Sequence, residues 1–297
     1  MTTLKTSPLA PRFGVVVHDL NLQDVQEEAD FFPIRAAFET HSALLFKGQD
    51  LDPETHMRLA KLFGPIEDRQ ADERKEGEAF KVPEVTNMTE AGGLTGEMDL
   101  HTLNLKSNFL WHADSTFMPE PALCNILTAK VVTETGGATE LASTRAAFAD
   151  MTPEKQAELR KLVLRHHYSH SRARISPELA KLPMFNKWPE TRWPAVWRNP
   201  VTGDEAIYVA SHAFAVEGMG EAEGAALIDE LIAACTKADY VYTHNWEVGD
   251  VLIWDQRAVL HRGRPWPLDQ ARKLASICVT ATDADGLSDM RVVMKSA

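Results

Sequence analysis

Two histidines and one aspartate have a spacing that suits a metal site. His112 and Asp114 lie two positions apart in the segment SNFLWHADSTF, residues 107–117, and His261 follows His112 by 149 residues. The apolar and aromatic residues of this segment predict a strand. In a strand, residues 112 and 114 would share one face and Ala113 would point to the other. Two ionisable side chains on one face must be solvated, paired with each other or bound to a ligand.

Two imidazoles and one carboxylate on one side of a metal ion leave three coordination positions open. This facial triad is typical of non-haem Fe(II) oxygenases, whose open positions take a co-substrate and O₂. A closed structural zinc site more often has four ligands that include cysteines. An H-x-D pair alone is a weak indication, because such pairs are common for structural reasons. His261 alone would be interpreted as a surface histidine in a basic loop.

Three further polar residues are placed where a dicarboxylate co-substrate would need them. Arg272 lies 11 residues after His261, in QARKLAS. Thr139 lies 27 residues after His112, in TGGATELAS, and Asn108 lies four residues before His112. A dicarboxylate that chelates iron through one end needs a cation and a hydroxyl for its far carboxylate. An arginine fork and a threonine hydroxyl suit that task.

The composition is that of an ordinary soluble globular protein. The chain has 297 residues, of which 44% are hydrophobic and 25% charged, enough for one large β-rich domain or two small ones. The formal net charge of −12 argues against nucleic acid or an anionic membrane surface as a partner. A small anionic substrate stays open, because local basic residues set the field inside a pocket.

Cysteine usage and the N-terminal residues predict a cytoplasmic protein. The three cysteines, Cys124, Cys235 and Cys278, are odd in number and form no C-x-x-C pair, which argues against a disulfide framework. Residues 1–14 lack the apolar core of a signal peptide. No apolar run reaches the length that spans a bilayer.

The hydrophobic pattern predicts a mainly β protein with helical decoration. Strands are predicted over 12–20, 42–48, 107–117, 124–132, 206–211, 250–255 and 274–282. Helices are predicted over 24–41, 52–64, 152–165 and 220–238. Pro33 would kink or break the first helix. The strands do not alternate regularly with helices, which favours an antiparallel architecture over a doubly wound parallel sheet.

Two stretches before the His112 segment have the composition of surface loops. Residues 67–81 are rich in charged residues and residues 89–99 are rich in glycine. One of them could form a lid, and a solvated loop is an equally good interpretation. We predict one domain over 1–297, with a mobile lid or loop region at 67–105.

Together, these segments resemble the Fe(II)/2-oxoglutarate-dependent dioxygenases of the taurine and 2,4-dichlorophenoxyacetate type. The resemblance covers nearly the whole chain. It is carried by the order and spacing of ALLFKGQDLDPETHMRLAKLFGPIE, WHADSTF, GGATELAS, HAFAVEGM, GDVLIWDQRAVLHRGRPW and ARKLAS. It implies a double-stranded β-helix, a distorted jelly-roll, with the iron inside its open end.

The resemblance also implies the cofactors and the residues that hold them. The cofactors are Fe(II), 2-oxoglutarate as co-substrate and O₂. The implied site residues are, for the metal, His112, Asp114 and His261 and, for 2-oxoglutarate, Arg272, Thr139 and Asn108. Arg272 and Thr139 would bind the 5-carboxylate, and Asn108 would line the same pocket.

Within this family, NFLWHADSTFMP and HAFAVEGM are most similar to the enzymes that cleave aryloxyalkanoates, including phenoxypropionates. Those relatives often have an arginine directly before the histidine of HAFAVEGM, where this chain has Ser211 before His212. If that arginine holds the substrate carboxylate, this chain needs another cation or a different substrate. Lys106 and His212 are the main candidates, and Ser211 is a further expected substrate contact. Arg262, Arg264 and Lys273 are other candidate cations, although exposed charges beside a loop are usually solvated. Trp111 and Phe117 could flank an aromatic substrate, and Trp111 is equally suited to core packing.

The reaction implied by the resemblance is hydroxylation of a carbon next to an ether oxygen, as in herbicide degradation. The product would collapse to a phenol and a 2-oxo acid, while 2-oxoglutarate gives succinate and CO₂. One alternative is the same chemistry on an alkylsulfonate, a sulfate ester or another small carboxylate. A remote alternative is a metal-binding jelly-roll without oxygenase chemistry, which would need neither Arg272 nor Thr139. A homo-oligomer is expected, because oligomers are common among the relatives.

Overall fold

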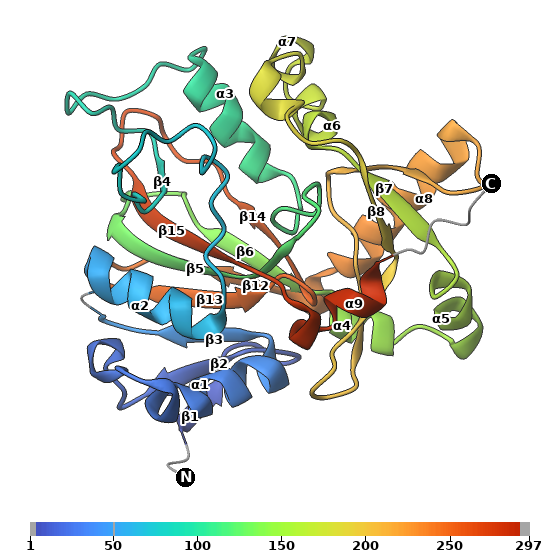
Figure 1. Cartoon of the computed structure of the whole chain (residues 1–297), viewed down its shortest axis with the longest axis horizontal. Helices are drawn as coiled ribbons and strands as arrows, with labels where there is room; N and C mark the ends of the chain where they lie inside the picture. Colours follow the sequence, from blue (N-terminus) through green and yellow to red (C-terminus); the bar gives the residue numbers. More distant parts are fainter. Residues whose placement is uncertain (1–3, 50, 292–297) are drawn as a thin grey trace.

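The largest sheet is built from the short apolar runs of the sequence. In the computed structural model, which describes residues 4–49 and 51–291, it has the strand order β1-β2-β3-β13-β5-β15-β4 (Figure 1). Its strands are β1 (Lys5–Pro8), β2 (Val15–His18), β3 (Ala43–Phe46), β4 (Glu84–Thr86), β5 (Ala122–Val131), β13 (Val251–Asp255) and β15 (Lys273–Thr280). Neighbouring strands are antiparallel except β2 and β3, which confirms the expected antiparallel architecture.

A second, smaller sheet with the order β12-β6-β14 packs against one face of the large sheet. Its strands are β6 (Thr139–Ser143), β12 (Val241–His244) and β14 (Val259–Gly263). Leu141 and Val259 of this sheet share a buried cluster with Leu127, Trp254 and Leu274 of the large sheet. Burial of such side chains is the main term that holds the two sheets together.

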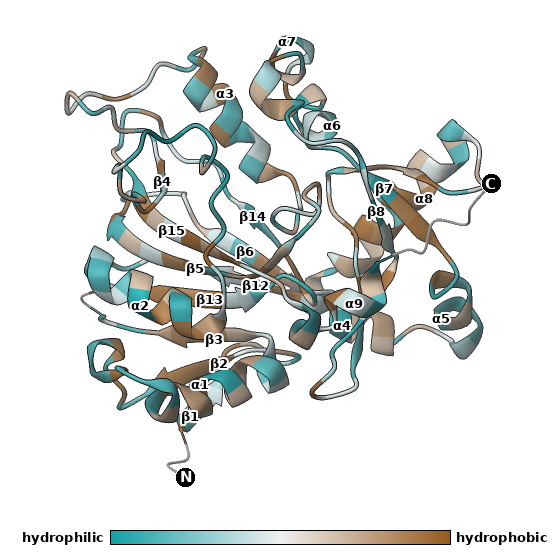
Figure 2. Ribbon diagram, in the orientation of Figure 1, coloured by the Kyte–Doolittle hydropathy of each residue, from teal (hydrophilic) through white to brown (hydrophobic). Residues whose placement is uncertain are grey.

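Two helices cover the other face of the large sheet. They are α1 (Glu28–His41) and α2 (Pro53–Phe63), whose phenylalanines meet edge to face. Asp52 caps α2 by accepting a hydrogen bond from the Thr55 amide, and Gly64 ends it, within the range predicted for this helix. Pro33 lies inside α1 without breaking it. Figure 2 shows the apolar residues gathered in β3, β5 and β13 behind these helices.

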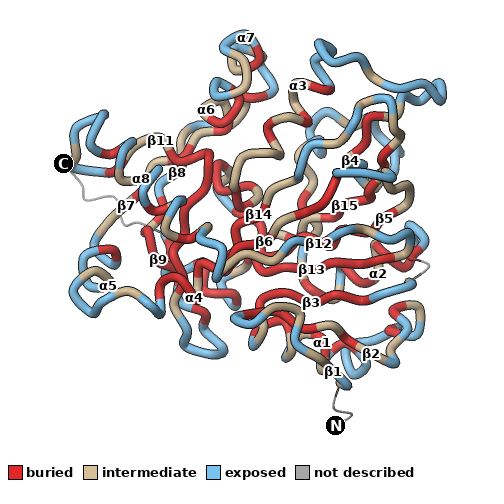
Figure 3. The backbone as a smooth tube through the Cα atoms, turned by 180° about the vertical axis from the view of Figure 1, so that it is seen from behind, coloured by how far each residue is buried: buried red, intermediate tan, exposed pale blue. Residues whose placement is uncertain are grey.

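The remaining elements lie against the small sheet or at one end of both sheets. They are β7 (Val163–His166), β8 (Thr191–Pro194), β9 (Val196–Arg198), β10 (Glu205–Ile207), β11 (Ala213–Val216), α3 (Leu100–Lys106), α4 (Thr144–Ala149), α5 (Pro153–Leu159), α6 (Tyr168–Ala173), α7 (Pro177–Ala180), α8 (Glu221–Cys235) and α9 (Leu287–Met290). Short 3₁₀ turns add Leu22–Asp24, Ser107–Phe109, Pro183–Phe185, Ala238–Tyr240 and Asp283–Asp285. Figure 3 shows that buried backbone runs along β3, β13, β6 and β14. Among the described residues, no helix is long and apolar enough to cross a membrane.

Two of the predicted elements are wrong. Residues 107–117 are not a strand: Ser107–Phe109 form a 3₁₀ turn, and the chain turns again at Ser115, whose φ is +58°. Within this segment only His112 forms a β-bridge, with His261. The helix predicted over 152–165 ends at Leu159, because its last residues enter β7. In both cases an apolar run fitted more than one type of element, and tertiary pairing decided which one formed.

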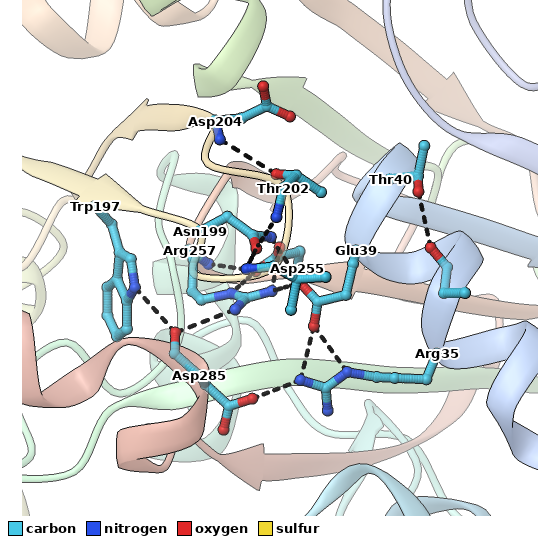
Figure 4. A network of polar contacts seen from close by, with 12 residues as sticks. Arg35, Glu39, Thr40, Trp197, Asn199, Thr202, Asp204, Asp255, Arg257 and Asp285 are labelled. Atoms are coloured by element: carbon cyan, nitrogen blue, oxygen red, sulfur yellow. Dashed lines mark hydrogen bonds and ion pairs between the residues drawn. The ribbon is translucent and has the colours of Figure 1, made fainter.

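A buried ionic network joins α1 to the C-terminal part of the chain (Figure 4). Arg257, in the turn between β13 and β14, donates hydrogen bonds to Asp255 at 2.9 and 3.0 Å and to Glu39 of α1 at 2.6 Å. Arg35 of α1 bonds Glu39 and Asp285. Burial opposes the charge of Arg257, but Asp255 and Glu39 outweigh it and raise the pKa of Arg257 above its ordinary value. The network fixes the β13–β14 turn that precedes His261.

We expect Arg257→Met to lower the free energy of unfolding by about 3–5 kcal/mol, because the buried carboxylates of Asp255 and Glu39 lose the cation that they share. Urea unfolding followed by circular dichroism measures the change. The control is Lys5→Met, which removes the exposed Lys5–Asp19 pair and should change stability by no measurable amount. Equal stability of the Arg257 variant and the wild type would show that the network is not needed for the fold.

Candidate metal centre and active site

His112 and His261 are held side by side by their own backbones. The His112 amide donates to the His261 carbonyl at 3.0 Å, and the His261 amide donates to the His112 carbonyl at 2.8 Å. The two imidazole centroids lie 4.0 Å apart. His261 is the central residue of β14, which pairs with β6, so the bridge ties the isolated His112 segment to a regular sheet.

Asp114 completes a cluster of three potential ligands. Its carboxylate oxygens lie 3.8 Å from Nε2 of His112 and 3.7 Å from Nε2 of His261. One ligand atom from each residue falls within 4.8 Å of the others. Nδ1 of His112 is hydrogen-bonded to the Leu110 carbonyl at 2.7 Å, so that Nδ1 carries the proton and Nε2 presents a lone pair. The structure therefore brings together the three residues predicted as metal ligands.

Two carboxamides position the carboxylate of Asp114. The side-chain amides of Gln256 and Asn125 donate to its Oδ2 at 2.6 and 3.0 Å. Gln256 also accepts a hydrogen bond from the Asp114 amide at 2.9 Å, and Ser276 holds Asn125. Because these side-chain amides are neutral donors, they hold the Asp114 carboxylate without giving it a proton, and it stays ionised. Sequence reasoning missed both residues, since neither lies near His112 in the chain.

The charge states of the three side chains suit a divalent cation. Burial lowers the pKa of His261 to about 3 and also lowers that of His112, so both imidazoles are neutral and can donate a lone pair. Burial would raise the pKa of Asp114, but the imidazoles of His261 and His112 and the charge of Arg69 outweigh it and hold this pKa below its ordinary value. Two neutral imidazoles and one carboxylate form the donor set of a facial-triad metal site.

Arg272 and Thr139 lie in the same cavity as this cluster. Arg272 is only 4% exposed, and its Nε and Nη2 donate to the Gly137 carbonyl at 3.1 and 2.8 Å. Its guanidinium lies 4.7 Å from the ring centroid of Trp266, and it forms no ion pair with any carboxylate of the described residues. Burial lowers its pKa to about 10. Thr139 accepts a hydrogen bond from Trp246, which leaves its hydroxyl proton for another acceptor.

Gly137 is required at its position for two reasons. Its φ of +69° is strained for any residue with a side chain, and an added Cβ would lie 3.0 Å from Nε of Arg272. The glycine pair in TGGATELAS thus allows the backbone to approach the arginine and receive its hydrogen bonds.

The cavity has a volume of about 520 Å³ and is lined by all six residues predicted to hold the metal and 2-oxoglutarate. Asn108 lines it beside the aromatic rings of Phe109 and Trp266. Its other aromatic lining residues are Phe80, Tyr168, Trp188 and Trp254. Much of the region 67–105 contributes to its wall, including parts of β4 and α3.

None of the five residues predicted to contact the substrate lines this cavity. Lys106 lies at the end of α3, and its ammonium group is 3.3 Å from the carboxylate of Glu97. Phe117 is buried and stacks on Tyr168 with ring centroids 3.7 Å apart. Tyr168 lines the cavity, so Phe117 supports the wall from behind.

The other three residues predicted to contact the substrate also lie behind the wall. The His212 ring packs edge to face on His112 with centroids 6.3 Å apart. Ser211 is buried, and its amide donates to the Trp111 carbonyl at 3.1 Å. The guanidinium of Arg262 lies over the Trp111 ring, 4.5 Å from the ring centroid. These contacts buttress the metal cluster.

A mainly β protein with two imidazoles and one carboxylate facing a deep cavity has the architecture of a mononuclear non-haem metal oxygenase. Residues 5–278 match the family described as taurine catabolism dioxygenase TauD, TfdA family. The chain belongs to this family. It is a non-haem iron, 2-oxoglutarate-dependent dioxygenase and uses Fe(II), 2-oxoglutarate and O₂.

Relatives of known activity cover most of the chain. The alpha-ketoglutarate-dependent 2,4-dichlorophenoxyacetate dioxygenase of Cupriavidus pinatubonensis is 32% identical over 271 residues, which cover 90% of this chain and 94% of that protein. The (S)-phenoxypropionate/alpha-ketoglutarate-dioxygenase of Sphingobium herbicidovorans is 32% identical over 274 residues, covering 90% and 91%. The crystal structure of AAD-2 in complex with Mn(II) and N-oxalylglycine has a TM-score of 0.88 at 29% identity, covering 95% and 99%.

We expect His261→Ala to weaken Mn(II) binding by more than about 100-fold, because it removes one of three protein ligands rather than an outer contact. Titration calorimetry of the metal-free protein measures this without turnover. The control is His101→Ala: His101 also lines the cavity, but its ring bonds the Thr86 carbonyl outside the cluster. Unchanged Mn(II) affinity in the His261 variant would place the metal elsewhere.

Proposed function

We propose that this chain hydroxylates the carbon next to the ether oxygen of an aryloxyalkanoate such as a phenoxyacetate or phenoxypropionate. The unstable product collapses to a phenol and a 2-oxo acid, while 2-oxoglutarate is converted to succinate and CO₂. The observation that carries the proposal is the set of aromatic side chains around the metal cluster in a cavity of about 520 Å³. The two relatives with 32% identity act on aryl ethers of this class by their names, which supports it.

The proposed fold is the double-stranded β-helix of this family. The large sheet and the β12-β6-β14 sheet face each other across a shared core, and His261 lies on one of them. The TM-score of 0.88 to AAD-2 supports this assignment. On this proposal the chain is one domain over 1–297, of which residues 1–3, 50 and 292–297 lie outside the described residues.

In the proposed metal site, His112, Asp114 and His261 hold Fe(II). Bound iron supplies O₂ activation, with electrons from the oxidative decarboxylation of 2-oxoglutarate. The chain itself contributes two neutral imidazoles and one ionised carboxylate, whose ligand atoms already lie within 4.8 Å of one another. The carboxamides of Gln256 and Asn125 keep the carboxylate oriented.

In the proposed co-substrate site, Arg272 and Thr139 bind the 5-carboxylate of 2-oxoglutarate and Asn108 lines the pocket. A buried guanidinium without a carboxylate partner is costly unless an anion binds beside it. The Arg272 fork is fixed by Gly137 and Trp266, and the Thr139 hydroxyl offers a proton. These features fit a carboxylate held by a charge-assisted contact and an additional hydroxyl.

The aromatic walls have two tasks in this proposal. Rings such as Tyr168, Trp188 and Trp266 supply flat apolar surface for an aryl group, and they exclude water from the reacting carbon. A short alkylsulfonate would leave most of that surface unfilled. The homo-oligomer, the cytoplasmic location and the closing of 67–105 over the site remain predictions from the sequence.

The test is a substrate panel with the iron-loaded protein. Under anaerobic conditions, addition of 2-oxoglutarate should produce a weak charge-transfer absorption band. In air, phenoxyacetates and both enantiomers of phenoxypropionates should yield succinate and phenol in equal amounts. Succinate with an alkylsulfonate or sulfate ester, and none with aryl acids, would overturn the aryl ether assignment and keep the dioxygenase. Absence of the band would contradict the assigned co-substrate site.

We expect Arg272→Met to raise the 2-oxoglutarate concentration for half-maximal turnover by about 100-fold, because a buried charge-assisted contact is lost. Succinate release at varied 2-oxoglutarate measures it. The control is Arg264→Met, since Arg264 is half exposed and does not line the cavity. An Arg272 variant with wild-type dependence on 2-oxoglutarate would show that another group binds the 5-carboxylate.

A further inference from the structure

The cations of the cavity divide into those that already have an anionic partner and those that do not. Arg69 pairs with Glu67, and Arg74 pairs with Asp68. Lys187 pairs with Asp72 and Glu73. Two buried arginines, Arg172 and Arg272, line the same cavity and form no ion pair with any carboxylate among the described residues. Lys81 also lines the cavity without an ion pair there, but it is exposed.

Arg172 is held in place by neutral groups only. It lies in α6 and is 7% exposed. Its Nη2 donates to Oδ1 of Asn104 at 3.1 Å and to the Tyr168 hydroxyl at 3.2 Å, and its Nη1 donates to Oγ of Ser171 at 2.9 Å. Its guanidinium lies over the ring of Tyr168, 4.2 Å from the centroid. Its buried Nε has no hydrogen-bond partner in the described part of the chain.

A guanidinium fixed in this way is prepared for an anion. Neutral oxygens orient the fork without cancelling its charge, and burial makes an uncompensated charge expensive. Burial is also the main cause that lowers the pKa of Arg172. A planar oxyanion that reaches the cavity would form a charge-assisted contact with it.

Arg172 and Arg272 lie in separate environments. Arg272 is bonded to Gly137 and stacked on Trp266, and none of these groups contacts Arg172. The far carboxylate of 2-oxoglutarate can neutralise only one of the two arginines. The second one therefore needs a second anion, and the remaining molecule that enters the cavity is the substrate to be oxidised.

The surroundings of Arg172 connect it to the metal cluster. The Tyr168 ring lies 5.8 Å from that of His212, and the His212 ring packs edge to face on His112. Arg172 and Tyr168 line the same cavity as His112. The rest of an acid bound at Arg172 would therefore lie among the aromatic side chains of the cavity, next to the metal ligands.

We propose that Arg172, positioned by Asn104 and Tyr168, binds the carboxylate of the primary substrate and makes the enzyme select acids over neutral ethers. This inference rests on the proposed function, because it names the binding group for that substrate. It also explains how this chain can bind an acid with Ser211 in the position where relatives often have an arginine. Ser211 is buried behind the wall, and Arg172 supplies the cation instead.

The test compares an acid with its neutral isostere. Phenoxyacetate and phenoxyacetamide have nearly the same shape, and only the first carries a charge. For the wild type we expect kcat/KM to favour the acid by at least about 100-fold. In Arg172→Met the acid should lose about 30–300-fold in kcat/KM, mostly through KM, while the amide changes by less than about threefold. The preference for the acid then disappears.

Two further variants serve as comparisons. Arg172→Lys keeps the charge but loses the fork, so the preference for the acid should persist with KM raised about tenfold. Arg74→Met removes a cavity-lining arginine that is already paired with Asp68, and its selectivity should equal that of the wild type. Circular dichroism and thermal unfolding check that each variant folds. If the methionine variant does not fold, Arg172→Gln, which keeps a hydrogen-bonding side chain, takes its place with the same expected loss of selectivity.

The outcomes separate this inference from the proposed function. Unchanged selectivity in Arg172→Met, or in Arg172→Gln where it replaces the methionine variant, overturns the role of Arg172. If the wild type releases no phenol from any aryl acid, the proposed function fails, and binding is scored instead by the shift of the anaerobic charge-transfer band. Binding of phenoxyacetate that is lost in Arg172→Met then still supports the anion site. A wild type that binds neither the acid nor the amide overturns both.

Discussion

The site depends on one pair of backbone hydrogen bonds, those between His112 and His261. They join an irregular segment to the centre of β14. This strand pairs with β6 and follows the turn in which Arg257 is hydrogen-bonded to Asp255. With both backbones fixed, two imidazoles 4.0 Å apart need no flexible loop to bring them together. Asp114 can then approach both from the turn that follows, so local geometry sets the ligand spacing.

A second constraint is the charge that is buried in the cavity wall. The chain has a formal net charge of −12, yet the cavity contains two buried guanidinium groups without carboxylate partners among the described residues. Net charge therefore says little about what the cavity attracts, because burial isolates local charges from the rest of the surface. Neutral groups hold both arginines: Gly137 and Trp266 around Arg272, Asn104 and Tyr168 around Arg172. Fixed cations held by neutral contacts are suited to binding anions reversibly.

The sequence predicts the antiparallel, mainly β class, which the structure confirms, and three metal ligands, whose side chains the structure brings together. Strands β5 and β13 are mostly apolar runs, whereas β6 and β14, which are as long as β13, are polar in part. The 107–117 segment has strand composition but turns at Ser115, and only tertiary contact reveals that. Lys106 illustrates the same limit, because closeness in sequence to the metal ligands does not say which face of the wall a side chain occupies.

The cavity wall has two layers: side chains that face the cavity, and side chains that support them from behind. This arrangement explains why the residues that contact the substrate are the hardest to predict. Trp111 and Phe117, which lie beside the ligands in sequence, are placed behind the cavity wall, and the His212 ring packs on His112 from the same side. The groups that face the cavity come from elsewhere, since Tyr168 and Arg172 belong to α6, more than 50 residues from His112. Substrate range in such a cavity can therefore change through α6 and the 67–105 region while the metal ligands and their supports stay the same.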